Sequence, residues 1–472
     1  MNATGQATLE QAVIAVCGDV LGRTGIGPTD EFGELCADLS VAVRVTTLLN
    51  QLLGAELTVM RLFSEGTPRR LAATLGSLGI AAPPITTRHR AMDDVDRRQR
   101  YWETTYRFRN PNQQDRFNTA GWTDSASLTS LPEQYMREWT ECTVARIRGL
   151  RPRRVLDIGC GVGLILFRLA AECERYVGVD FSSVAVEQVG NTLAAERGFD
   201  HVDVAHADAL QAAELTAETY DLVLLNSVVQ YFPDIDYLAA VLSTAVRRLA
   251  SGGTLLLGDI RHRDLHHAMR VSAAAGSDDD TPVELVRLVA EQATATDSPL
   301  LLAPWELCRI AGTTGADLSF TPLVRRGSHP TEMNRFRYDV LLTVDDEPAP
   351  RPDTELRWHP QHAGSLAQLL DSTSGSLVLR QVPDARNFPA VRLAKAVDTA
   401  PAGSTMGQLR RSLGAMPSID PEETWELGHR KRFGVAIGPS DVPGLVDVAF
   451  HRGHDDRATA RLLTRACPRS SE

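Results

Sequence analysis

Hydrophobic positions in the first eighty residues recur at the spacing of one face of an α-helix. Val13, Val16, Val20 and Leu21 are three, four or one residue apart. A second group follows the same spacing: Val41, Val45, Leu48, Leu49 and Leu52. Side chains three and four residues apart lie on the same side of a helix. The pattern therefore predicts a small domain of short amphipathic helices over residues 1–80.

From about residue 96 the pattern changes to short apolar runs that alternate with helical spacing. Such alternation is typical of an α/β fold, in which helices connect the strands of a parallel sheet. It predicts one α/β domain over residues 96–345. Residues 356–455 mix strand and helix patterns and predict a small α+β domain. Two segments with Pro and mixed charge, 81–95 and 345–355, are interpreted as linkers.

Composition narrows the classes of protein to consider. The chain has 472 residues, of which 43% are hydrophobic and 23% charged, as in a globular protein of several domains. A net charge of −11 argues against a nucleic-acid partner, because Lys and Arg must neutralise phosphates there. Seven scattered cysteines without a CxxC pair argue against a zinc ribbon or a disulfide framework. With no leader pattern and no membrane-length apolar run, we expect a cytoplasmic protein with reduced thiols.

The strongest chemical signal is a glycine-rich turn after the predicted strand 154–158. The turn contains Gly159, Gly161 and Gly163, and a helical pattern follows it. Glycine permits positive φ and a close approach of ligand to backbone, and open α/β sheets bind ligands at the carboxyl ends of their strands. A dinucleotide-binding GxGxxG turn would need a glycine where Leu164 stands. The GxGxG spacing therefore indicates another ligand.

Polar residues also end the next strands. Asp180 ends a second strand, about one strand–helix–strand unit after Asp157. A carboxylate at this place can accept hydrogen bonds from two ribose hydroxyls. Asp208 follows a third strand, Asn226 ends a fourth, and Asp259 ends a fifth. The sequence thus predicts one site built from several strand ends.

Together these residues resemble class I S-adenosylmethionine-dependent methyltransferases, which have a Rossmann-like sheet. The resemblance implies an enzyme that uses S-adenosyl-L-methionine and releases S-adenosyl-L-homocysteine. In that family the glycines of the turn pass close to the methionine part of the cofactor. The resemblance implies that Asp180 holds the ribose hydroxyls and that Asp208 faces the adenine. The residues implied to bind the cofactor are Asp157, Gly159, Gly161, Gly163, Asp180, Phe181, Asp208, Ala209, Asn226 and Ser227.

Four segments resemble a narrower group, the methyltransferase domains embedded in nonribosomal peptide synthetases and hybrid polyketide synthases. They are 117–139, 226–233, 258–261 and 336–342. Most of that group methylate the nitrogen of an aminoacyl thioester on a carrier protein. The resemblance implies transfer to an amino group of an amino-acid-derived or carrier-tethered peptide or polyketide intermediate. These 472 residues show no adenylation domain of the kind that usually surrounds such a domain, so we expect a substrate that arrives already made. Transfer to oxygen or carbon, and a non-catalytic scaffold, remain alternatives.

Residues 31–63 resemble the acyl or peptidyl carrier domain of the same synthases. In that family an Asp-Ser-Leu motif carries phosphopantetheine on its serine. Here Leu39 stands at the serine position after Asp38, and Ser40 is one residue further, rotated by about 100° on a helix. Leucine has no hydroxyl to modify. The sequence therefore predicts a degenerate carrier-like domain, kept for docking of synthetase or carrier proteins or for packing.

Methyl transfer requires alignment of the acceptor with the methyl group and exclusion of water. The candidates for acceptor contacts or a base follow the fourth and fifth strands: Gln230, Tyr231, Asp259, His262 and His266. The two histidines admit three interpretations, namely a metal pair, a solvated helix start, or a base. Trp122 and Met136 are the predicted lid over the cofactor, where aromatic faces would attract a sulfonium. We expect no resident metal.

Overall fold

The computed structural model describes these residues: 3–21, 25–35, 39–53, 57, 59–78, 80, 99, 102–103, 105–106, 116–119, 121–122, 124, 130–215, 217–296, 299–344, 349–453 and 455–467. They belong to two compact units, one formed by Met1–Asp94 with Gln292–Ser298 and the other by Val95–Glu291 with Pro299–Glu472. The predicted linker 81–95 lies outside the described residues.

The N-terminal part of the first unit is helical. Its helices are α1 (Ala3–Leu21), α2 (Phe32–Leu35), α3 (Leu39–Leu53), α4 (Val59–Glu65) and α5 (Pro68–Ser77). Val13, Val16 and Val20 are buried in its core, which confirms the helical face predicted from their spacing. The α5 helix begins at Pro68, and the Thr67 hydroxyl caps it by accepting from a backbone N–H.

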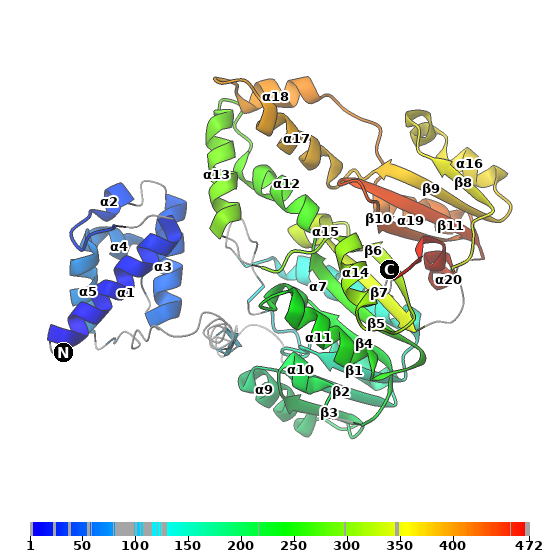
Figure 1. Ribbon diagram of the computed structural model, residues 1–472, viewed down its shortest axis with the longest axis horizontal. Coiled ribbons are helices and arrows are strands. Elements are labelled where there is room, and N and C mark those ends of the chain that lie inside the picture. The colour runs from blue at the N-terminus through cyan, green and yellow to red at the C-terminus, as the bar shows by residue number, and fades with distance from the viewer. Residues whose placement is uncertain are drawn as a thin grey trace. The chain divides into compact units, whose positions relative to one another are not determined.

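The second unit is built on an eight-stranded sheet (Figure 1) with the order β12-β6-β7-β5-β4-β1-β2-β3. The strands are β1 (Arg154–Ile158), β2 (Arg175–Asp180), β3 (Val202–His206), β4 (Tyr220–Asn226), β5 (Leu249–Arg261), β6 (Leu318–Val324), β7 (Arg337–Val344) and β12 (Arg465–Ala466). Strands β1 to β5 pair in parallel, whereas β7 is antiparallel to both β5 and β6. The α/β fold with a Rossmann-like sheet is confirmed.

The order of strands reverses between β1 and β4. From β1 the chain proceeds to β2 and β3 on one side, and then returns to place β4 and β5 on the other. The helices that follow β1 and β4 leave the sheet in opposite directions from this point. Open α/β sheets bind ligands in the crevice that results. The topology therefore fixes where a ligand site is to be expected.

Both faces of the sheet are buried, which explains why its strands are apolar without alternation. Leu156 and Leu225 face one helical layer, while Val155 and Leu224 face the other. The helices of this region are α7 (Glu133–Leu150), α8 (Leu166–Leu169), α9 (Ser183–Ala195), α10 (Ala209–Ala212), α11 (Ile235–Val246), α12 (Arg263–Ala274), α13 (Val283–Thr296), α14 (Pro304–Gly312) and α15 (Glu332–Phe336). Short 3-10 turns are η1 (Ala170–Glu172) and η2 (Val229–Tyr231).

The C-terminal part forms a second, four-stranded sheet with the order β10-β11-β9-β8. Its strands are β8 (Thr354–Arg357), β9 (Ser376–Pro383), β10 (Phe433–Pro439) and β11 (Leu445–Arg452). Its helices are η3 (Pro360–Gly364), α16 (Leu366–Ser372), α17 (Phe388–Thr399), α18 (Met406–Leu413), α19 (Pro421–Arg430), α20 (Asp456–Ala460) and η4 (Arg461–Leu463).

The two sheets share a core instead of folding apart. Val378 and Ala449 of the small sheet pack in one cluster with Leu341 of the large sheet. A Cβ atom on Gly438 of β10 would lie 2.4 Å from the carbonyl oxygen of Pro322 in β6, so the two backbones touch. Strand β12 then returns to pair with β6. The boundaries expected at 96–345 and 356–455 stay a prediction, since both segments belong to one compact unit.

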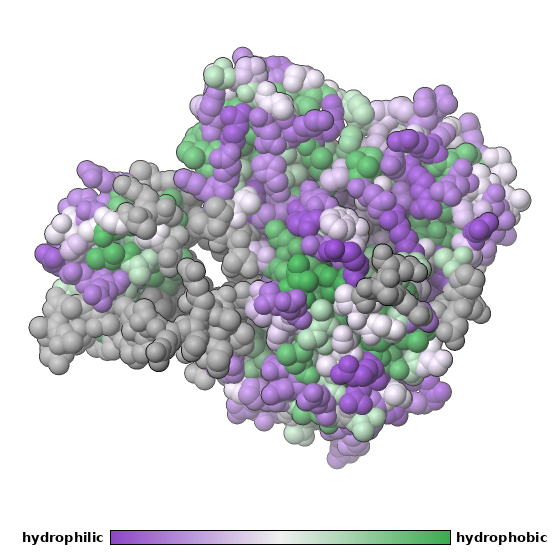
Figure 2. Space-filling model, in the orientation of Figure 1, coloured by the Kyte–Doolittle hydropathy of each residue, from purple (hydrophilic) through white to green (hydrophobic). Residues whose placement is uncertain are grey.

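The surface of the larger unit is mostly hydrophilic on the face that Figure 2 shows, as expected when the apolar side chains are packed inside. Figure 2 shows hydrophilic residues over much of the visible face of the larger unit, with hydrophobic residues in separate areas between them. Across the part of the chain that the structure describes, no helix combines the length and the apolar character needed to cross a membrane.

Candidate functional site

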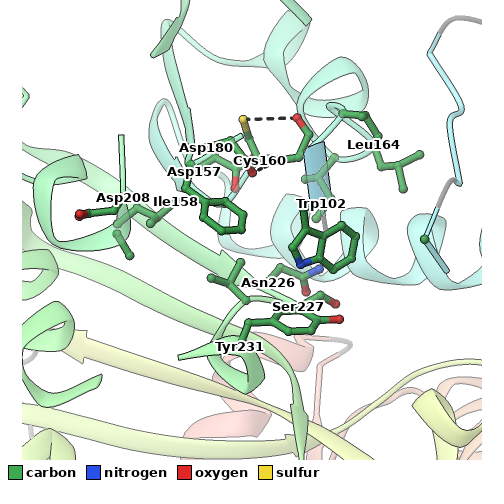
Figure 3. A pocket seen from close by; sticks show the side chains of 18 of the residues that line it. Trp102, Asp157, Ile158, Cys160, Leu164, Asp180, Asp208, Asn226, Ser227 and Tyr231 are labelled. Atoms are coloured by element: carbon green, nitrogen blue, oxygen red, sulfur yellow. Dashed lines mark hydrogen bonds between the residues drawn. The ribbon is translucent and has the colours of Figure 1, made fainter. Parts of the chain in front are cut away.

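A cavity opens at the carboxyl ends of β1, β2 and β4, where the strand order reverses (Figure 3). Together with the open space at its mouth it encloses about 1310 Å³. Strand-end residues predicted from the sequence line it: Asp157, Gly159, Gly161, Asp180, Phe181, Asp208, Ala209, Asn226 and Ser227. The structure thus brings residues from four separate strand ends into one wall. Gly163 lies behind this wall.

The glycine-rich turn needs glycine for its backbone and for its packing. Gly159, Gly161 and Gly163 have φ values of +81°, +53° and +81°. A Cβ on Gly159 would lie 2.3 Å from Cγ2 of Val228, and a Cβ on Gly163 would lie 2.7 Å from the Phe167 ring. Larger residues would therefore both strain the turn and push the wall apart. The turn is fixed further by the Gly159 N–H, which donates to the Val179 carbonyl at 2.7 Å.

Two buried carboxyl groups lie at the ends of β1 and β2. Asp180 accepts hydrogen bonds of 2.8 Å from the backbone N–H groups of Gly161 and Ser182. Burial raises the pKa of Asp180 to about 6, although these N–H groups favour the charged form. Burial raises the pKa of Asp157 to about 7, against the opposing effect of the Tyr176 hydroxyl that donates to it. Asp180 can thus hold the glycine turn and still face the cavity.

Asp208 and Asn226 complete the predicted strand-end set. Asp208 caps α10, where its carboxylate accepts from the Gln211 N–H at 2.8 Å and Gln211 bonds back. Asn226 is 7% exposed, and its buried Oδ1 accepts no hydrogen bond from the described protein groups. This oxygen is packed against β5, since a Cβ on Gly258 would lie 2.1 Å from it.

Aromatic side chains cover the cavity opposite the glycine turn. Trp102 packs edge-on against Tyr231 with ring centroids 5.3 Å apart, and Trp122 lies 4.4 Å from Trp139. All four line the cavity, so the predicted Trp122 is at the wall, whereas Met136 does not line the cavity. It is fully buried beneath the wall, in a cluster with Trp139, because its position on α7 points it into the core.

Asp259 lies directly behind the wall and is fully buried. Its Oδ2 accepts from the Ser227 hydroxyl at 2.5 Å and from the Arg337 guanidinium at 2.6 Å. Its Oδ1 accepts from the Trp139 indole N–H at 3.4 Å, and the Arg325 guanidinium is 3.8 Å away. Asp259 therefore does not line the cavity. It supports two residues that do, Ser227 and Trp139.

Other residues predicted to contact an acceptor lie elsewhere. Tyr231 lines the cavity and is 38% exposed. Gln230 is buried in η2 and does not line it. His262 caps α12 by accepting from the Asp264 N–H, and burial lowers its pKa to about 4. His266 is buried on α12 and is also absent from the cavity wall. Gln230, His262 and His266 thus do not line this cavity, and their expected contact with an acceptor stays a prediction that the cavity wall does not support.

Sequence reasoning missed several residues of the site. Val228, Phe232 and Tyr237 line the cavity, and Arg325 and Arg337 hold Asp259 from behind. Arg337 lies in the family-like segment 336–342, but its contact with Asp259 depends on the pairing of β7 with β5, and Arg325, which follows β6, lies in none of the four segments. Val228 and Phe232 lie in the family-like segment 226–233, shortly after β4, and this position could have indicated a place at the wall. Among the described residues, no cluster of three or more His, Cys, Asp or Glu side chains could hold a metal ion.

Two segments of the chain match known domain families. Residues 156–255 match the methyltransferase domain family. Residues 11–75 match the family of phosphopantetheine attachment sites. The first segment contains the strand ends β1, β2 and β4 that form the cavity, and the second contains helices of the N-terminal unit.

The chain is similar to parts of much larger proteins. It is 31% identical over 357 residues to the chondramide synthase cmdD of Chondromyces crocatus, which covers 74% of this chain and 9% of that protein. It is 34% identical over 271 residues to the probable non-canonical nonribosomal peptide synthetase CymA of Salinispora arenicola, which covers 57% of this chain and 3% of that one. The chain thus spans less than a tenth of the length of these relatives.

Among solved structures, the N-methyltransferase NodS of Bradyrhizobium japonicum WM9, in complex with S-adenosyl-L-homocysteine, is similar to part of this chain. The identity is 18%, the match covers 43% of this chain and 86% of that one, and the TM-score is 0.30.

Proposed function

We propose that this chain, which belongs through its residues 156–255 to the methyltransferase domain family, is an S-adenosylmethionine-dependent methyltransferase of secondary metabolism. Its acceptor is an amino group of an amino-acid-derived or carrier-tethered peptide or polyketide intermediate. The observation that carries the proposal is the single cavity in which the glycine turn, Asp180, Asp208 and Asn226 meet. The similarity to nonribosomal peptide synthetases supports the class of substrate.

The residues at the cavity fit this cofactor. Asp180 offers a buried carboxylate for two ribose hydroxyls, and Asn226 offers a buried oxygen without a protein donor. The turn at 159–163 has no side chains at its three glycines, and Gly159 and Gly161 line the cavity, so a ligand can approach their backbone closely. Aromatic faces opposite the turn attract a positively charged sulfonium. When bound, S-adenosylmethionine supplies a methyl group on a neutral leaving thioether, so the reaction needs no general acid.

The chain's own residues align the acceptor with the methyl group and keep water away from the reacting atoms. Trp102, Trp122 and Trp139 line the cavity, and we expect them to exclude water when the site is occupied, which strengthens the polar contacts inside it. Tyr231 and Ser227 are placed to hold an acceptor beside the glycine turn. An amine acceptor must be unprotonated when it attacks. Holding it in line with the methyl group replaces a bimolecular encounter and contributes several kcal/mol to the lowering of the barrier.

The N-terminal unit suggests how the acceptor is presented. Residues 11–75 match phosphopantetheine attachment sites, yet Leu39 stands where that family has its serine. Asp38 lies outside the described residues, and the structure describes only the backbone of Leu39 and Ser40. We propose that this degenerate carrier-like domain docks synthetase or carrier proteins and does not carry the substrate itself.

Calorimetric titration with S-adenosylmethionine and S-adenosylhomocysteine tests the cofactor. Micromolar binding of both is the expected result. Absence of binding by folded protein would favour a scaffold. Incubation with isotopically labelled cofactor and matched aminoacyl, hydroxyacyl and acyl thioesters, free and on a separate carrier protein, then tests the acceptor. Label on nitrogen alone supports the proposal, whereas label on oxygen or carbon overturns the choice of atom.

A further inference from the structure

Ser227 and Asp259 adopt an unusual backbone conformation at neighbouring strand ends. Their φ values are +59° and +61°, in the left-handed region that non-glycine residues rarely adopt. Asn226 of β4 pairs with Gly258 of β5, and the Ser227 N–H donates to the Gly258 carbonyl at 3.0 Å. Strain of this kind persists where the surroundings enforce it and is concentrated at functional sites.

The surroundings of Asp259 are ionic and closed. Arg337 donates to its Oδ2 and also pairs with Glu332, while Arg325 pairs with Asp339 at 2.8 Å. The backbone N–H of Asp259 donates to Asp339 at 2.8 Å. The Arg337 and Arg325 guanidinium groups flank the Asp259 carboxyl group, at 2.6 and 3.8 Å. The position of the Asp259 side chain is therefore fixed by these contacts before any ligand enters.

This arrangement decides what Ser227 can offer to the cavity. A hydroxyl has one proton and two lone pairs. The Ser227 proton is committed to Oδ2 of Asp259 at 2.5 Å, so only lone pairs of its oxygen remain for a group in the cavity that it lines. The hydroxyl is thus an acceptor of hydrogen bonds, and the charge of Asp259 behind it makes it a strong one.

We propose that Ser227 holds an N–H of the acceptor amine, and that Asp259 and Arg337 are positioning residues that give the Ser227 hydroxyl this polarity. This inference rests on the proposed function and deepens it. With one N–H directed to Ser227, the nitrogen lone pair is free to face the methyl group. It also assigns Ser227, which the sequence resemblance places among the cofactor contacts, to the acceptor.

The chemistry of the step favours nitrogen over oxygen. The nitrogen lone pair forms the new N–C bond while the S–C bond breaks and leaves its electron pair on sulfur. The nitrogen keeps its hydrogens, becomes positive, and later loses a proton to solvent. The Asp259 charge, relayed by the Ser227 dipole, stabilises this developing positive charge. A hydroxyl acceptor would instead pass its proton towards Asp259, and a neutral Asp259 would leave Arg337 without a buried counter-charge, which is costly.

The experiment compares Ser227→Ala and Ser227→Gly with the wild-type chain. Both variants remove the hydroxyl, but only glycine relaxes the φ of +59°. Three quantities are measured: affinity for S-adenosylhomocysteine, affinity of the loaded protein for a panel of aminoacyl N-acetylcysteamine thioesters and their hydroxyacyl counterparts, and kcat/KM for methyl transfer. We expect unchanged affinity for S-adenosylhomocysteine, and a loss of about 10- to 100-fold in kcat/KM for the amine in both variants.

The outcomes separate this inference from the function on which it rests. Failure of the wild type to bind S-adenosylhomocysteine overturns the proposed function. Binding of S-adenosylhomocysteine that weakens in both serine variants overturns the inference, because Ser227 then belongs to the cofactor. If no turnover occurs, the affinity of the loaded protein for the aminoacyl thioesters decides. A lower affinity in both variants than in the wild type supports the inference, and an affinity that is unchanged or undetectable overturns it. Divergence of the Ala and Gly variants assigns the effect to backbone strain and also overturns it.

Asp259→Asn and Arg337→Lys test the positioning residues. Asp259→Asn leaves Arg337 without its partner, and the protein can fail to fold for that reason. Arg337→Lys keeps the charge and loses the planar fork. We expect a partial loss of kcat with little change in KM for S-adenosylmethionine, together with a smaller preference for the amine over the matched hydroxyl thioester. An unchanged preference in folded Arg337→Lys, with kcat intact, contradicts the positioning role.

Discussion

The Tyr176 hydroxyl donates a hydrogen bond of 2.8 Å to Oδ2 of Asp157, and both side chains are buried between β1 and β2. The bond ties the strand that precedes the glycine turn to its neighbour. It does not fully offset the cost of burying the carboxylate, because burial still raises the pKa of Asp157 to about 7. The glycine turn is therefore attached to a group that titrates near neutral pH.

This pKa predicts how stability depends on pH. The folded-state pKa of Asp157 lies above its ordinary value of 3.8, so the folded chain holds this proton more tightly than the unfolded chain. The contribution to stability is fully present below about pH 4 and is lost as pH rises through about 7. In Asp157→Asn, which keeps an acceptor for Tyr176, we expect this dependence to disappear.

Urea unfolding at pH 5 and pH 8 measures the difference. The free energy of unfolding of the wild type should fall by about 2–3 kcal/mol more than that of Asp157→Asn over this interval, given about 1.4 kcal/mol per pH unit of titration. Equal changes in the two proteins would mean that the pKa of Asp157 is close to its ordinary value.

Asp180→Ala should weaken the binding of S-adenosylhomocysteine about 10- to 100-fold, because hydrogen bonds to a charged group contribute about 1.5–3 kcal/mol. Calorimetry gives the affinity, and circular dichroism shows whether the fold is kept, since Asp180 also holds Gly161. Asp203→Ala is the matched control: Asp203 lies on the next strand, its side chain is 64% exposed, and it does not line the cavity. Equal affinities in the two variants would contradict the ribose role.

The strand-end groups could be predicted from the sequence, because each follows an apolar run and parallel strands end at the same edge of a sheet. The support behind them could not. Arg337 reaches Asp259 only because β7 runs antiparallel to β5, and no local pattern encodes that pairing. Met136 was expected at the lid but is buried in the core, because spacing along a helix does not show on which side the cavity lies. For the same reason the sequence could not show that His262 caps α12 and does not line the cavity.

Gly159→Ala tests the packing of the glycine turn. An added Cβ would lie 2.3 Å from Val228 Cγ2 at a φ of +81°. Gly198→Ala is the control, because Gly198 has a φ of +94° but open space around it. Thermal unfolding should show a cost of about 1–2 kcal/mol for Gly198→Ala from the backbone alone. Gly159→Ala should cost about 1–3 kcal/mol more, from overpacking, and should weaken S-adenosylhomocysteine binding.

Adding Val228→Ala to Gly159→Ala should recover part of this loss, since it removes the colliding methyl groups. A loss that Val228→Ala does not relieve would show that backbone strain, and not the contact with Val228, makes glycine necessary at position 159.

His262→Asn separates a structural from a catalytic role of this histidine. Burial lowers the pKa of His262 to about 4, so the ring is neutral at pH 7, and it packs against Tyr338 away from the cavity. Asparagine is also a good helix cap. We expect a small loss of stability with kcat and its pH profile unchanged. A tenfold fall in kcat with an altered pH profile would instead support a base, one of the three interpretations that the sequence left open.

Leu39→Ser should restore a site for phosphopantetheine. The carrier family attaches this group to a serine hydroxyl, residues 11–75 match that family, and α3 begins at the position in question. Incubation with coenzyme A and a phosphopantetheinyl transferase, followed by intact-mass measurement, should show modification of Leu39→Ser and none of the wild type. Ser40→Ala is the control, since a residue one position along a helix points about 100° away. Modification of the wild type that Ser40→Ala abolishes would show that Ser40 is the attachment site, and the carrier-like domain would then carry a substrate itself.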